Sequence, residues 1–145
     1  MNILLLFCAC FFLLGGTSNA QDPEILDKYQ WNNRLLLVYA ASNESPVYQE
    51  QVQEFEQHQK GVEERDLVIF FIFPQKVINP EGKVSPSQTA DYLRQRYSIA
   101  SDQFAVILIG KDGGAKLTEK EFLSTDRLFG TIDQMPMRQR EMRSN

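Results

Sequence analysis

Two stretches of the chain contain the side chains best suited to bind a ligand. Lys111 and Asp112 belong to a Gly-Lys-Asp-Gly-Gly turn, and Arg138 and Arg140 lie near the C-terminal end. Ammonium and guanidinium groups hold carboxylates and phosphates by charge-assisted hydrogen bonds. We therefore predict that these four residues bind a small anionic ligand or a partner protein. The alternative is a solvated basic tail, because runs of charge usually face water.

A second candidate anion site lies where the first predicted helix begins. Asn43 and Ser45 come just before Pro46, which suits the first position of a helix. Such a helix start offers free backbone N–H groups that can hold an anion. The ordinary alternative is that Ser45 caps the helix and Asn43 supports a turn.

Most catalytic chemistries lack the residues they need. Cys8 and Cys10, the two cysteines, lie in an N-terminal segment that we expect to be removed, so the mature chain has no thiol for redox or metal chemistry. His58, the single histidine, lies between two glutamines, and we expect it to face solvent rather than to serve in a triad or metal site. Three methionines could bind Cu(I), but Met is a common core filler: Met135, Met137 and Met142.

No pattern identifies catalytic residues, and we predict no cofactor or metal. An enzyme of the hydrolase or lyase type, using carboxylate and arginine side chains, is the alternative to a binding module. No pair of carboxylates has a spacing that favours it. Binding of nucleic acid would need a strongly basic face. The chain has a net charge of −4, and its sequence indicates no such face.

The N-terminal segment has the pattern of a signal peptide. Residues 1–20 contain no charged side chain, and an apolar run over residues 3–14 is followed by small residues ending at Ala20. The run is short for a membrane span, which needs ~20 apolar residues. We predict cleavage after Ala20 and one secreted or periplasmic domain over residues 21–145. Contact with a membrane is expected only if the segment stays uncleaved.

Three continuous apolar runs are typical of strands buried on both faces: residues 35–40, 67–73 and 104–109. Helices are predicted to begin at Ser45, at Ser85 with Gln88 in capping-box spacing, and at Ser124, the last ending or kinking at Pro136. Short strands are expected at residues 77–78 and 83–84, around a turn, and at residues 115–117, after the turn that contains Asp112.

This order of elements is that of the thioredoxin core. We predict an α/β fold with a central mixed four-stranded sheet in the order βαβαββα, and helices on both faces. In redox proteins of this fold the reactive dithiol follows the first strand. Residues 41–46, which occupy that place here, include no cysteine. The sequence therefore predicts a thioredoxin-like module without thiol chemistry.

The chain resembles a family of exported thioredoxin-like domains of unknown function, the DUF4174 type. The stretches that match are residues 31–40, 64–68, 104–114 and 132–142, and Gly-Lys-Asp-Gly-Gly and Met-Pro-Met-Arg are the most specific. Related domains occur in extracellular-matrix proteins with sushi repeats or a coiled-coil label. The resemblance implies the fold and supplies no catalytic residues. Together with the residues it favours a binding module outside the cell.

Overall fold

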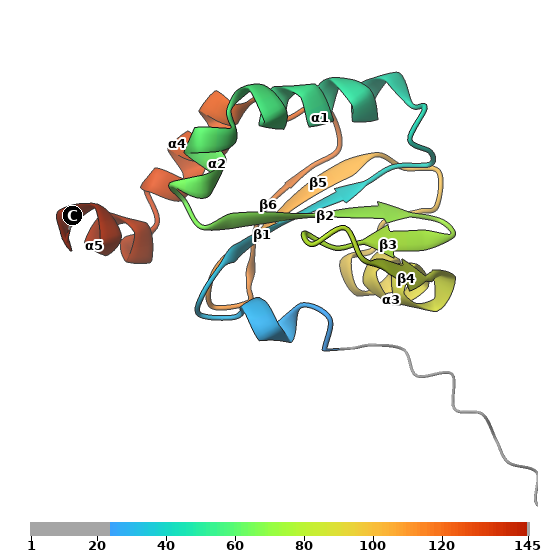
Figure 1. Ribbon diagram of the computed structural model, residues 1–145, viewed down its shortest axis with the longest axis horizontal. Coiled ribbons are helices and arrows are strands. Elements are labelled where there is room, and N and C mark those ends of the chain that lie inside the picture. The colour runs from blue at the N-terminus through green and yellow to red at the C-terminus, as the bar shows by residue number, and fades with distance from the viewer. Residues whose placement is uncertain (1–23, 145) are drawn as a thin grey trace, which may run out of the picture.

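The computed structural model describes residues 24–144, so the predicted signal peptide lies outside the described residues. One mixed sheet of six strands runs through the centre, in the order β4-β3-β2-β1-β5-β6 (Figure 1). Its middle strands are β1 (Arg34–Tyr39), β2 (Leu67–Phe73) and β5 (Ala105–Ile109). These agree within one residue with the three predicted apolar runs. All residues of β1 and β5 are buried, as expected for strands covered on both faces.

The connection between β1 and β2 is a parallel crossover, as predicted. It contains α1 (Pro46–Gln57) and the short α2 (Gln59–Glu63), which are separated at His58. By contrast, β5 runs antiparallel to β1, with Ile109 opposite Leu35. The turn that follows β5 therefore lies beside the start of β1, and this places the candidate site.

The prediction of four strands was too low. The small hairpin of β3 (Lys76–Ile78) and β4 (Val84–Pro86) does not stand apart from the sheet. Instead β3 pairs antiparallel with the end of β2, Val77 opposite Ile72, and extends the sheet at that edge. On the other edge β6 (Ala115–Glu119) pairs with β5 through the predicted Asp-Gly turn.

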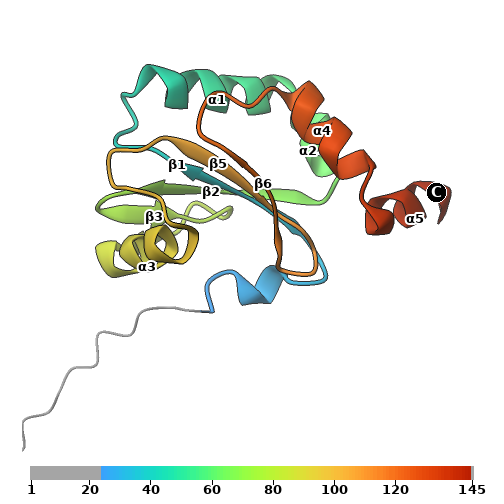
Figure 2. The ribbon, with the colours of Figure 1, turned by 180° about the vertical axis from the view of Figure 1, so that it is seen from behind.

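Helices cover both faces of the sheet, and each face has its own apolar core. Strand side chains pack beneath α1, α2 and α4 (Thr125–Asp133) on one face. On the other face they pack against α3 (Ser87–Tyr97) and the 3₁₀ helix η1 (Asp27–Tyr29). Seen from behind, α1 and α4 again lie on the side of the sheet opposite α3 (Figure 2).

Two helix predictions hold and one does not. The hydroxyl of Ser124 accepts a hydrogen bond from the backbone N–H of Arg127 and caps α4. Pro46 is the first residue of α1, as predicted, although Ser45 makes no capping bond with its side chain. The capping box of Ser85 is wrong, because β4 continues through Pro86 and α3 begins at Ser87.

A fourth long helix begins at Pro136. α5 (Pro136–Ser144) starts at that proline, whose fixed φ suits the first helical position, and it buries none of its residues. In both ribbon views it projects to one side, beyond α4 (Figures 1 and 2). The chain end is therefore helical, although the sequence pattern left its conformation open.

A buried glutamine fixes where α4 begins. The amide of Gln51, on α1, donates from Nε2 to the carbonyl of Leu123 at 2.8 Å and accepts from the N–H of Leu123 at 2.7 Å. One turn later Glu54 accepts from the N–H and hydroxyl of Thr125 at 2.8 and 2.7 Å, and these bonds lower the pKa of its carboxyl group. The side chains of α1 thus replace the partners that a strand would have provided for this loop.

We expect Gln51→Leu to lower the free energy of unfolding by about 2–4 kcal/mol, because it strands two buried backbone groups. The matched control is Gln53→Leu, two residues away on the exposed side of the same helix. Chemical denaturation of both variants checks this. Equal stability of the two would show that the Gln51 bonds contribute nothing.

Candidate functional site

The predicted Gly-Lys-Asp-Gly-Gly turn is a tight hairpin loop between β5 and β6. The N–H of Gly110 donates to the carbonyl of Gly114 at 2.8 Å, and Gly113 has a φ of 84°, which favours glycine. Asp112 is engaged within this loop: its carboxylate accepts from the N–H of Gly114 at 3.0 Å and pairs with Lys116 at 2.7 Å. These bonds hold the pKa of Asp112 below its usual range. Asp112 is thus part of the scaffold of the loop.

Lys111 meets the C-terminal helix at the carboxylate of Glu141. Its Nζ lies 2.8 Å from Glu141 Oε1 and 2.8 Å from Asp66 Oδ2. From the other side Arg34, the first residue of β1, donates Nη1 and Nη2 to the two oxygens of Glu141, each at 3.2 Å. Such a two-pronged contact is the strong geometry for a guanidinium and a carboxylate. The hairpin, β1 and α5 therefore converge on one acidic group.

Arg138 joins the same network. Its Nε lies 3.3 Å from Asp133 Oδ1 and its Nη1 lies 3.6 Å from Glu141 Oε2, while Nη1 also donates to the carbonyl of Glu64 at 2.8 Å. Arg65 closes the chain of contacts by donating to both oxygens of Asp133, at 3.0 and 2.7 Å. Four cations thus share three carboxylates. The structure brings Lys111 and Arg138 together, which the sequence could not establish.

Two carboxylates of the network, those of Glu141 and Asp133, have lowered pKa values. Burial alone would raise the pKa of Glu141, but the hydrogen bonds from Lys111 and Arg34 outweigh it and lower that pKa. Burial opposes the bonds from Arg65 and Arg138 at Asp133 in the same way, and its pKa is also lowered. A general acid would need a raised pKa. These groups are therefore suited to ion pairing rather than to proton transfer.

Arg140, the fourth predicted ligand residue, is exposed on α5. Within residues 24–144 neither Arg140 nor its neighbour Arg143 has a carboxylate at ion-pair distance. Arg140 lines an open hollow of about 500 Å³ together with Glu64, Asp66 and Ser144. These two arginines add positive charge to a surface whose network already has one more cation than carboxylates.

Trp31 lies beside the hairpin and faces solvent. Of the two aromatic side chains just before β1, only that of Tyr29 covers the core, at 7% exposure. The Trp31 side chain is 64% exposed. Its backbone has a positive φ of 69°, and its N–H donates to the carbonyl of Lys111 at 2.6 Å. This bond turns the chain before β1 and holds the indole outside the core.

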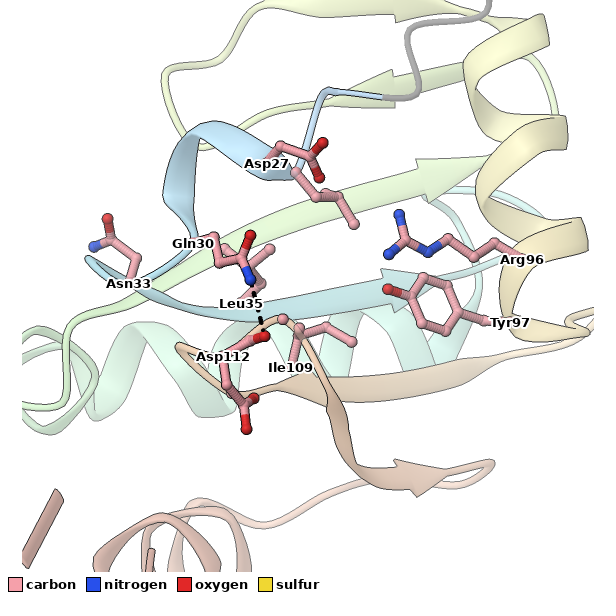
Figure 3. A pocket seen from close by; sticks show the side chains of 11 residues that line it. Asp27, Gln30, Asn33, Leu35, Arg96, Tyr97, Ile109 and Asp112 are labelled. Atoms are coloured by element: carbon pink, nitrogen blue, oxygen red, sulfur yellow. Dashed lines mark hydrogen bonds between the residues drawn. The ribbon is translucent and has the colours of Figure 1, made fainter. Parts of the chain in front are cut away.

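Two small cavities flank the hairpin. One, of about 130 Å³, lies between η1, the end of α3 and the loop (Figure 3). Arg96 and Tyr97 reach into it from α3, above a floor that includes Leu35 and Ile109, while Gln30 donates to the carbonyl of Asp112 at 3.0 Å. The other, of about 150 Å³, lies between the loop and the start of α5, and its lining includes Arg34, Lys111, Met135 and Met137.

The second predicted anion site is at the opposite end of the sheet. Asn43 and Ser45 follow the C-terminal end of β1, whereas Lys111 lies beside its N-terminal end. The carbonyl of Asn43 accepts from Gln49 Nε2 at 3.3 Å. The structure therefore does not join the two predicted sites, and the basic network lies away from the position at which redox proteins of this fold place their dithiol.

Several members of the network were missed from the sequence: Arg34, Arg65, Asp66, Asp133, Glu141. Only Arg34 could have been noticed in the sequence, because a charged residue directly before a continuous apolar run needs a partner.

Among residues 24–144, no three His, Cys, Asp or Glu side chains gather closely enough to hold a metal ion. No helix in the same range is long and apolar enough to span a bilayer. His58 is half-exposed, with its Nδ1 3.8 Å from Glu54 Oε1.

We expect the network to add acid-sensitive stability. Because Asp133 and Glu141 have lowered pKa values in the folded chain, their contribution is fully present above their unfolded values, 3.8 and 4.5, and is lost as pH falls through the folded values. The thermal midpoint should be flat above about pH 5 and should fall in more acid solution. Glu141→Gln should flatten part of that fall, and Glu121→Gln, an exposed control, should not. Parallel profiles for all three proteins would contradict this.

Comparison with known proteins places the chain within a family. Over 138 residues it is 27% identical to the sushi repeat-containing protein SRPX of Rattus norvegicus, and 27% identical to that of Homo sapiens. The match covers 93% of this chain but 29% of each SRPX protein, so the chain spans less than a third of the length of these relatives.

Solved structures show the fold alone. A reduced 2-Cys peroxiredoxin of Plasmodium vivax has a TM-score of 0.62 at 13% identity, over 81% of this chain and 84% of that one. Thioredoxin peroxidase I of Plasmodium yoelii has the same score and identity, over 79% of each chain. The predicted thioredoxin-like fold is confirmed. The model of the family "Domain of unknown function (DUF4174)" matches residues 25–141, and this chain belongs to that family.

Proposed function

We propose that this chain is an exported, non-catalytic binding module that recognises an acidic segment of a partner protein. The binding surface consists of Trp31, the 110–114 hairpin loop and the exposed face of α5, and we call it the hairpin–α5 surface. The observation that carries the proposal is local: within residues 24–144 of a chain of net charge −4, two exposed arginines without an ion pair lie on α5, the helix that Lys111 contacts, and an exposed tryptophan lies beside the same loop.

The charge on this surface supports an acidic partner. Arg140 and Arg143 are exposed and point their charge to solvent next to a network in which cations outnumber carboxylates. Complementary charge of this kind speeds association and selects partners. We keep the four predicted ligand residues in this surface: Arg140 is exposed on it, whereas Lys111, Asp112 and Arg138 are held by ion pairs in the loop and the network.

The exposed tryptophan supports a protein partner rather than a small anion. Large exposed side chains of this type are enriched at the energetic centres of protein interfaces. Trp31 and Met142 are two of the three large hydrophobic side chains that are most exposed within residues 24–144. A small anion would gain little from contact with the exposed indole of Trp31, whose backbone N–H bonds the carbonyl of Lys111.

The absence of thiols supports the non-redox part of the proposal. The two cysteines precede residue 11, and the loop after β1 contains none. Export is supported by the apolar run and small residues of the N-terminal segment. The chain is similar to part of SRPX, a longer protein that contains sushi repeats by its name, so a related segment occurs there beside further protein sequence, which suits a binding module.

Trp31 is the only tryptophan, so its fluorescence reports directly on the proposed surface. We expect a hexaglutamate peptide to shift the emission of Trp31 and to bind more weakly as salt rises. Arg140→Ala with Arg143→Ala should weaken binding about fivefold, from roughly 0.5 kcal/mol for each exposed charge. The control pair Lys76→Ala with Lys120→Ala removes two exposed charges elsewhere and should leave affinity unchanged.

A hexalysine peptide serves as the second control. If hexalysine binds as well as hexaglutamate, or if neither peptide changes the emission of Trp31, the surface does not recognise acidic protein segments.

Export has its own test. We expect the protein recovered from outside the cytoplasm of expressing cells to begin at Gln21, as read by mass spectrometry of its N-terminal peptide. An intact Met1 on the native protein would contradict cleavage and would leave the N-terminal segment as a tether.

A further inference from the structure

The carboxylate of Glu141 occupies a site that has the features of a carboxylate receptor. It takes two parallel hydrogen bonds from Arg34 at 3.2 Å and an ion pair with Lys111 at 2.8 Å. Both cations come from elements far away in the chain. A two-pronged contact from an arginine is a strong and specific way for a protein to hold a carboxylate. Here a second cation, Lys111, lies beside it. We call the pair formed by Arg34 and Lys111 the socket.

The socket is fixed by the body of the protein and not by α5. The Arg34 side chain is 1% exposed at the start of the fully buried strand β1, and its Nη1 also donates to the carbonyl of Arg65 at 3.0 Å. Its Nε is buried and has no partner among the described residues. Lys111 is held by Asp66 at 2.8 Å. Each cation therefore keeps one partner from the body of the protein when Glu141 leaves: the carbonyl of Arg65 for Arg34, and Asp66 for Lys111.

The helix that supplies Glu141 is held much less firmly. α5 buries none of its residues, and Met142 on it is 45% exposed. Apart from Glu141, its polar anchor is Arg138, which contacts Asp133 and the carbonyl of Glu64. Elements with few buried apolar contacts open at low free energy. The two sides of the contact thus differ, with a rigid receptor and a weakly held occupant.

We propose that Arg34 and Lys111 form a binding site for a Glu or Asp side chain of the acidic partner, and that Glu141 is its intramolecular occupant. This rests on the proposed function, because the partner is the acidic segment that the hairpin–α5 surface recognises. The partner's carboxylate enters when α5 moves away, and the cavity of about 150 Å³ beside Arg34 and Lys111 accommodates the approaching side chain. Glu141 therefore competes with the partner and lowers its affinity.

Competition predicts a gain of affinity when Glu141 loses its charge. We expect hexaglutamate, followed by Trp31 fluorescence, to bind Glu141→Gln at least about tenfold more tightly than the unaltered protein, as when a binding-competent state rises from a tenth of the molecules to most of them. The matched control is Glu64→Gln. It removes a carboxylate that lines the open hollow of about 500 Å³ together with Glu141, and it should change affinity little. Equal affinity for Glu141→Gln and the unaltered protein, or an equal gain in Glu64→Gln, would overturn the competition.

A second measurement tests the socket without the partner. Glu141→Ala removes the atoms that acetate contains, so acetate should raise the thermal midpoint of this variant in a saturable way, while chloride at the same ionic strength should not. This variant leaves the buried Arg34 without a carboxylate, so it should be less stable than the unaltered protein, and circular dichroism checks that it folds. If it does not fold, Glu141→Gln with Lys111→Met replaces it: loss of the affinity gained in Glu141→Gln is expected, and its persistence would overturn the site.

The two measurements separate the failure of this inference from that of the proposed function. Acetate rescue without binding of hexaglutamate to any variant would keep the socket and reject the acidic protein partner. Equal binding of hexaglutamate to all variants without acetate rescue would keep the partner and reject the socket.

Discussion

Burying the guanidinium of Arg34 is the constraint on which this end of the molecule depends. A cation that is 1% exposed is strongly destabilising unless a carboxylate and further hydrogen bonds compensate it. Among the described residues, Arg34 takes a backbone carbonyl from Arg65, and the carboxylate that pairs with it is that of Glu141, more than a hundred residues later in the chain. Through Glu141, α5 also contacts Lys111 and Arg138, and Arg138 in turn contacts Asp133.

The antiparallel pairing of β5 with β1 makes this arrangement possible. It returns the chain to the start of β1, so that the hairpin loop, Trp31 and α5 share one end of the sheet. The start of α1, with Asn43 and Ser45, is left at the other end. A thioredoxin-like fold thus offers two separate ends on which a site can be built, and a fold alone does not decide which one is used. In this chain the charge and the exposed indole gather at the end without the helix start.

The sequence predicts the fold well because its signals are local. Continuous apolar runs, the Asp-Gly turn and Pro46 each act over a few residues, and the strands and helices fall where they indicate. The partners of Lys111 depend on contacts between distant segments, and no local pattern reports them. Hydrophobicity alone would place Trp31 in the core, but its side chain is exposed at the point where its backbone N–H donates to the carbonyl of Lys111. The sequence of α5 has no apolar stripe from which a helix could be predicted. Ion pairs such as Lys111–Glu141 hold this helix against the protein instead.

The most direct test of the account is to map the contact of an acidic peptide on the protein by nuclear magnetic resonance. Hexaglutamate is titrated into ¹⁵N-labelled protein, and the amide shifts are followed residue by residue. We expect the largest changes at Trp31, in the 110–114 loop and along α5, with residues 43–46 unchanged. Changes centred on residues 43–46, or shifts spread evenly over the whole surface, would contradict it.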